Sequence, residues 1–153
     1  MSYKLFWLLG SFLLLLAIVV YMIMNPSYEK SFEAKYFYSL GRYDKSLSLA
    51  KEAFALNNYN RMASTIMAQS KIALEYKQYI QQAKTYLSEI NLLVRKEDIS
   101  DADKARMRMM SQIVIQGYIK ISPSVVTDKN LVKEAAHYRE EFVKIHEKIS
   151  SSI

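Results

Sequence analysis

The stretch LFWLLGSFLLLLAIVVYMIM, residues 5–24, is apolar throughout and contains no charged side chain. As an α-helix it would span ~30 Å, which is the thickness of the hydrocarbon core of a bilayer. Aromatic rings lie near both of its ends, where they favour the membrane interface. We therefore predict a transmembrane helix here, preceded by a tail of residues 1–4. Its end residues and interface aromatics are Leu5, Trp7, Tyr21 and Met24.

Two other interpretations of this stretch have to be weighed. A cleaved signal peptide has an apolar region of about 7–15 residues that is followed by small residues. This run is longer and ends in Met22, Ile23 and Met24. A core helix of a soluble protein is rarely apolar on every face. The pattern favours an uncleaved anchor, which the following Asn25-Pro26 pair would end.

The charges beside the stretch do not decide its orientation, because Lys4 precedes it and Lys30 and Lys35 follow it closely. A short N-terminal tail is typical of signal anchors, and long domains cross the membrane largely regardless of charge. We expect the N-terminus inside and the rest of the chain outside the cytoplasm. The prediction is a single-pass protein of the bacterial inner membrane with a periplasmic C-terminal domain.

The composition of the whole chain indicates an all-α protein. Its 153 residues carry a net charge of +6 and include three Gly, two Pro and no Cys. So few Gly and Pro are atypical of a β-sandwich or barrel, and the lack of Cys excludes disulfides and thiolate chemistry. We expect residues 25–153 to form one domain of about six helices. The expected hairpins cover about 27–57, 59–95 and 101–150.

The first two expected hairpins differ in how clearly their turns are marked. Ser27 can cap the first helix, and Gly41 can end it because glycine accepts a left-handed conformation. Asn57-Asn58 marks the end of the second helix. Residues 59–95 contain neither Gly nor Pro, so they could form one long helix or a hairpin. We prefer a hairpin with a break near residues 75–78, because a single helix would find little else in so small a body to cover it.

The C-terminal third shows two helix starts and one regular apolar seam. Ser100-x-x-Asp103 resembles a capping box that would open a helix from 101 to about 120, and Thr127 and Asp128 suit the start of the last helix. A 4-3-4-3-4 spacing of apolar residues follows, typical of an a/d seam. The seam is Leu131, Ala135, Tyr138, Phe142, Ile145 and Ile149. It predicts either a contact within one bundle or docking onto a partner chain.

Residues 34–58 resemble a tetratricopeptide repeat, which is a helical hairpin of 34 residues. The residues LGRYDKSL at 40–47 match the turn and the start of the second helix of that motif. Ala34, Phe37 and Ala53 match its small and aromatic packing positions. The resemblance implies a short helical solenoid whose first helices line a concave, peptide-binding groove. The residues implied to face this groove are Tyr28, Ser31, Lys35 and Tyr38.

No pattern in the sequence predicts a catalytic, cofactor or metal site. His137 and His146 lie on opposite faces of one helix. Glu134-x-x-His137 matches half of a di-iron motif, but no second copy follows. Basic and acidic residues are interspersed, which is typical of a solvated helix exterior rather than a nucleic-acid face. Contact of Lys30 and Lys35 with anionic lipid is a further possibility.

These observations favour a non-catalytic interaction protein. Twelve Tyr and eight Met suit surfaces that cover a partner. The leading hypothesis is a membrane-anchored scaffold subunit of a larger bacterial envelope assembly, such as a secretion or flagellar-motor machine, with other membrane or envelope proteins as partners. The alternative is a transient adaptor or chaperone for an extended client peptide. Candidate partner-binding residues are Tyr28, Lys35, Tyr38, Leu131, Tyr138, Phe142, Ile145 and Ile149, with self-association through 131–149.

Overall fold

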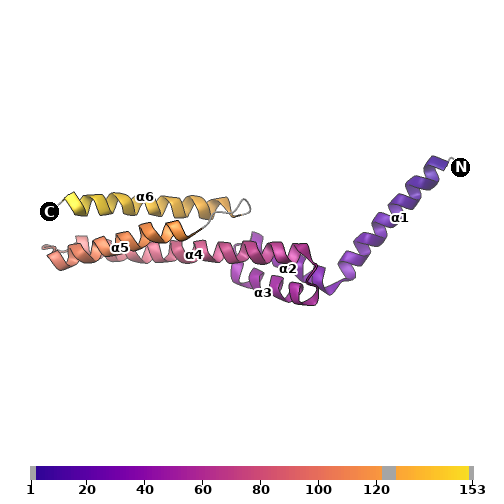
Figure 1. Cartoon of the computed structure of the whole chain (residues 1–153), viewed down its shortest axis with the longest axis horizontal. Coiled ribbons are helices and arrows are strands. Elements are labelled where there is room, and N and C mark those ends of the chain that lie inside the picture. The colour runs from indigo at the N-terminus through magenta and orange to yellow at the C-terminus, as the bar shows by residue number, and fades with distance from the viewer. Residues whose placement is uncertain (1–2, 122–126, 152–153) are drawn as a thin grey trace. The chain divides into compact units, whose positions relative to one another are not determined.

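The computed structural model describes residues 3–121 and 127–151, and every regular element among them is an α-helix (Figure 1). The predicted all-α class is confirmed for these residues. The helices are α1 (Tyr3–Met24), α2 (Pro26–Ser39), α3 (Tyr43–Leu56), α4 (Arg61–Val94), α5 (Asp101–Lys120) and α6 (Lys129–Ser151).

Helix α1 covers the predicted apolar stretch and is long and apolar enough to cross a membrane. None of its apolar window is buried inside the chain, which argues against a core helix. The helix ends where Asn25 turns to an extended conformation, and Pro26 then occupies the first turn of α2. The cap of α2 is Asn25, whose Oδ1 accepts a hydrogen bond from the Ser27 amide at 3.0 Å. The prediction that Ser27 caps this helix is therefore wrong.

The chain divides into two compact units, residues 1–71 and 72–153, where one domain over 25–153 was expected. Helix α4 contributes its first part to one unit and the remainder to the other. Each unit has its own core.

In the first unit, α2 and α3 form the expected hairpin (Figure 1). Gly41 ends α2 as predicted, with a φ of 71°, which is the left-handed region that glycine adopts without strain. The Gly41 amide donates to the Tyr38 carbonyl, and the Arg42 amide donates to the Phe37 carbonyl, both at 3.0 Å. These two bonds form a Schellman motif, so the last carbonyls of α2 are satisfied within the turn.

Small residues allow the helices of the first unit to approach closely. The fully buried alanines are Ala34, Ala50, Ala53 and Ala63. Five polar side chains are buried among them, namely Ser27, Ser31, Ser46, Asn60 and Ser70. Because buried polar groups must be hydrogen-bonded, this core is specified by donors and acceptors as well as by shape.

Helix α4 is continuous from Arg61 to Val94, so the predicted break near residues 75–78 is wrong. Tyr76, within the expected turn, has only 1% of its surface exposed. The physical reason is that α4 is covered in two places. Its Ile66 belongs to the core of the first unit, and Ile80 and Ile90 belong to the core of the second. Five helices therefore follow α1 in the described residues, rather than about six.

In the second unit, α4, α5 and α6 share one apolar core, and α5 and α6 lie against each other (Figure 1). The start of α5 is capped as predicted, because Ser100 Oγ accepts a hydrogen bond from the Asp103 amide at 3.1 Å. Asp128 Oδ1 likewise accepts from the Asn130 amide at 2.9 Å, at the predicted start of the last helix. Large core side chains from the three helices include Tyr76, Ile80, Met107, Met110, Val114 and Phe142.

Candidate interaction surfaces

The residues expected to line a groove on the first hairpin do not share one open face. Lys35 is exposed, whereas Tyr28 and Tyr38 are half-buried. Ser31 is fully buried, which contradicts the expectation that it faces a groove. The cause is the helical period, which places Ser31 on the same side of α2 as the buried Ser27 and Ala34.

The Ser31 hydroxyl takes part in a network that joins α2, α3 and the start of α4. Asn60 Nδ2 donates to Ser27 Oγ at 2.8 Å and to Ser31 Oγ at 3.0 Å. Ser27 Oγ in turn donates to the carbonyl of Ala53 on α3 at 2.8 Å. Asn60 Oδ1 accepts from the amide of Ala63 at 3.1 Å, in the geometry of an N-cap for α4. These groups are occupied in holding the fold together, so they are structural.

An exposed apolar stripe on α2 was missed in the sequence. Phe32, Tyr36 and Leu40 are each at least half exposed. They recur every four residues, so they lie on one side of the helix. The four-residue spacing can be read from the sequence. The sequence does not show which side of α2 is buried, because both sides carry aromatic residues.

The apolar seam of α6 packs inside the chain. Ala135 and Phe142 have 0% exposure, and Leu131, Tyr138, Ile145 and Ile149 pack against the same core. The intramolecular alternative is confirmed. Phe142 is therefore wrong as a partner-binding residue, because its side chain has no accessible surface. Self-association through 131–149 stays a prediction. It is now limited to the partly buried residues at the edge of the core, which are Leu131, Tyr138, Ile145 and Ile149.

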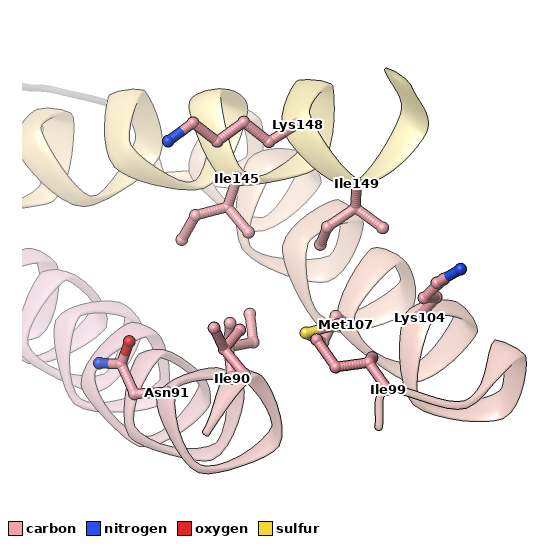
Figure 2. Close-up of a pocket in the computed structure, with 9 residues that line it drawn as sticks. Ile90, Asn91, Ile99, Lys104, Met107, Ile145, Lys148 and Ile149 are labelled. Carbon is pink, nitrogen blue, oxygen red and sulfur yellow. The ribbon is translucent and has the colours of Figure 1, made fainter. Parts of the chain in front are cut away.

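The end of this seam opens into an apolar groove of about 390 Å³. Ile145 and Ile149 point from α6 toward Met107 of α5 and Ile90 of α4 (Figure 2). Ile99, in the connection between α4 and α5, lies beside Met107. Residues 90–107 and residues 145–149, which are distant in the sequence, thus build this one site. Its lining residues are Ile90, Asn91, Val94, Ile99, Lys104, Met107, Ile145, Lys148 and Ile149.

Two charged side chains belong to the lining of the groove. Lys104 and Lys148 are the charged residues of its lining, and no carboxylate belongs to that lining. Their ammonium groups point away from the apolar floor (Figure 2). Lys104 lies 3.6 Å from the Asp101 carboxylate, which is fully exposed, so this pair is screened by solvent.

The ion pairs of the described residues stabilise helix contacts and do not resemble a reaction centre. The hydrogen bond from Lys30 to Glu52, 2.6 Å long, raises the pKa of the lysine and lowers the pKa of the carboxyl. It joins α2 to α3, and contact of Lys30 and Lys35 with anionic lipid stays a prediction. Burial raises the pKa of the Tyr79 hydroxyl to about 12, so this phenol is protonated at neutral pH.

Among the described residues, no group of three or more His, Cys, Asp or Glu could hold a metal ion. His137 lies 3.9 Å from Glu141 on the same helix, an exposed pair one turn apart. Comparison of the chain with family models, with curated proteins and with solved structures found no match.

Proposed function

We propose that this chain is a non-catalytic, membrane-anchored interaction subunit of a larger bacterial envelope assembly. In this proposal α1 crosses the inner membrane and the two helical units present surfaces to partner proteins. The exposed apolar side chains of α1 carry the proposal, because no part of the described chain covers them. Water is a poor solvent for so large an apolar surface, and a bilayer is a good one.

The helical units support the same proposal. The α2–α3 hairpin combines a glycine turn with fully buried alanines, which is how tetratricopeptide-like hairpins achieve close helix packing. Its exposed apolar stripe and the groove of the second unit are both surfaces of the kind that mark protein interaction sites. Their partners would be other membrane or envelope proteins.

Two measurements test the anchor. We expect the full chain to stay in the membrane pellet after carbonate extraction, and its intact mass to equal that of the uncleaved 17.8 kDa chain. A soluble, shortened protein would instead identify the apolar stretch as a cleaved signal peptide. Either loss of membrane retention or removal of α1 would overturn the proposed anchoring.

A third measurement tests the assembly. The chain is tagged at its C-terminus at native expression level, solubilised gently, and analysed for size and composition. We expect a large, defined complex whose neighbours identify the process. A species of monomer or dimer size that carries traces of changing clients would instead favour a transient adaptor.

A further inference from the structure

We infer that the α2–α3 hairpin stands end-on on the bilayer that α1 crosses, with Leu56 and Tyr59 inserted at the lipid interface and Arg61 on a headgroup phosphate. This inference deepens the proposed function and rests on its membrane anchor. It names the bilayer as the occupant of an apolar surface that the fold leaves exposed.

The surface lies where α3 ends and α4 begins. Leu56 is the last residue of α3 and is 56% exposed, and Tyr59, in the connection to α4, is 87% exposed. Arg61 begins α4 and is exposed as well. Within the described part of the chain, no carboxylate forms an ion pair with Arg61. We call these three residues the anchor-side tip.

Buried hydrogen bonds tie the anchor-side tip to the end of α1. Ser27 follows Met24, the last residue of α1, by three residues, so at most ~10 Å of chain separates the two. Ser27 Oγ donates to the Ala53 carbonyl and accepts from Asn60 Nδ2, both at 2.8 Å. The segment 53–60 is thus held at both of its ends by one residue beside the anchor.

This tie is short compared with the headgroup layer. The layer on one side of a bilayer is ~6 Å thick, half the difference between the whole bilayer and its hydrocarbon core. Tyr59 and Arg61 flank Asn60, so their backbone is within one residue of the tie to Ser27. Long amphipathic side chains bridge such a layer with their polar ends in the hydrated headgroups. A polar reagent therefore still reaches position 59 from its own side of the membrane.

The residue types of the anchor-side tip match a lipid interface. Tyrosine is enriched there, because its ring is apolar and its hydroxyl is polar. Residues 53–74 contain no Asp or Glu, so no carboxylate of this segment meets the phosphates. Arg61 opens α4, where the helix dipole disfavours a cation, and the first turn of α4 has no acidic residue to compensate. A headgroup phosphate supplies that compensation.

The apolar stripe on α2 fits lipid less well. Glu29 and Glu33 are exposed and lie three residues before Phe32 and Tyr36, hence on the same side of the helix. A hairpin lying flat on this stripe would press both carboxylates against the phosphates. End-on contact avoids this, and it places Leu40, at the other end of α2, ~20 Å further from the bilayer than Ser27.

The test uses the full chain in vesicles of phosphatidylcholine and phosphatidylglycerol whose acyl chains carry bromine near the headgroup. Bromine quenches tryptophan fluorescence on contact, and Trp7 is the only tryptophan, so the native chain reports on α1. In a Trp7→Phe background, Leu56→Trp and Leu40→Trp are a matched pair, because these leucines are 56% and 54% exposed. We expect quenching to be at least threefold stronger at position 56. Tyr59→Trp should behave like Leu56→Trp, and it carries the test if Leu56→Trp fails to fold.

A charge reversal supplies an independent readout. Arg61→Glu in the Tyr59→Trp protein should at least halve the quenching, because a carboxylate is repelled by phosphates. Lys71→Glu, an exposed position further along α4, should leave it unchanged. An acidic residue is favoured at the start of a helix, so Arg61→Glu does not weaken the fold. Equal quenching in both variants would overturn the role of Arg61.

The remaining outcomes separate the inference from the anchor. An unquenched Trp7 in the native chain would contradict the membrane anchor, and this inference with it. A quenched Trp7 together with no quenching at positions 56 and 59 would leave the anchor standing and overturn the inference. Strong and equal quenching at positions 40 and 56 would mean that the hairpin lies flat on the bilayer, which also overturns it.

Discussion

Asn60 forms three side-chain hydrogen bonds within the first unit. Its amide donates to two serines of α2, and its carbonyl oxygen caps α4. Replacing it with alanine would leave the hydroxyls of Ser27 and Ser31 without this partner in a buried site. An unmade buried hydrogen bond costs more than a made one contributes, so single side chains of this kind determine stability out of proportion to their size.

We expect Asn60→Ala to lower the free energy of unfolding by about 2–4 kcal/mol, the sum of a lost cap and two lost buried hydrogen bonds. Asn58→Ala, two residues earlier and exposed, is the matched control and should change it by less than about 0.5 kcal/mol. Urea unfolding of the full chain in detergent, followed by circular dichroism, measures both. Equal effects of the two substitutions would show that the network contributes nothing specific.

A second residue-scale prediction concerns pH. Hydrogen bonds from the Lys96 ammonium, 2.8 Å away, and from the Ser100 hydroxyl hold the pKa of the Asp103 carboxyl below its usual range. A carboxyl whose pKa is lowered by folding stabilises the fold above its unfolded pKa, about 3.9, and this contribution is lost as the pH falls through the folded pKa.

We therefore expect the Asp103 carboxyl carbon to titrate below ~3.9 in an NMR experiment on the labelled chain. The Lys96→Gln variant should shift its midpoint upward, because the first cause of the lowered pKa is removed. A midpoint that is the same in both proteins would mean that the Lys96 contact does not exist in solution.

At the scale of elements, the informative case is α4. Its residues contain no helix breaker, so local propensity permitted the continuous helix that the structure contains. A hairpin was the prediction for residues 59–95, because one long helix needs other helices packed against it along its whole length. The structure supplies that cover from α2 and α3 for the first part and from α5 and α6 for the remainder. The presence of two separate pairs of packing helices, rather than the sequence of α4 itself, therefore decides that α4 is continuous.

Gln78 tests this conclusion, because it lies at the expected break and is exposed. In a continuous helix, Gln78→Pro removes a backbone hydrogen bond and clashes with the preceding turn, so we expect a loss of ~3 kcal/mol or more. Gln78→Ala keeps the helix and should change stability by less than about 0.5 kcal/mol. Urea unfolding compares the two variants. Equal stability of the Gln78→Pro and Gln78→Ala variants would contradict a continuous α4 and would support the predicted hairpin.

For the whole molecule, the open question is the direction in which α1 crosses the membrane. Because the chain has no cysteine, single cysteines report their side without background labelling. Tyr3 precedes and Tyr59 follows the apolar stretch 5–24, and no part of the described chain covers either side chain; the two are 73% and 87% exposed. They form a matched pair of tyrosine positions for this test.

With the expected orientation, an impermeant maleimide added to cells with an opened outer membrane should label Tyr59→Cys. It should label Tyr3→Cys only after the inner membrane is made permeable. The reverse pattern would place both helical units in the cytoplasm. Labelling of both variants in intact spheroplasts would contradict a single crossing by α1.

Local features could be predicted from the sequence because each depends on neighbouring residues. The apolar stretch, the Asn25-Pro26 junction, the Gly41 turn and the Ser100 cap all act within a few positions along the chain. The sequence predicted less well which face of each helix is buried. Ser31 was expected at a groove and is buried, because the face of α2 that packs is chosen by α3 and α4.

The sequence by itself therefore determined the helical class, most helix ends and the presence of a segment that can cross a membrane. Tertiary structure alone decided that α4 is one helix, that the α6 seam faces its own core, and that an apolar groove exists. The physical reason is that helix capping and hydropathy are local quantities. Burial and the shape of a groove depend on segments such as 90–99 and 145–149, which only folding brings together.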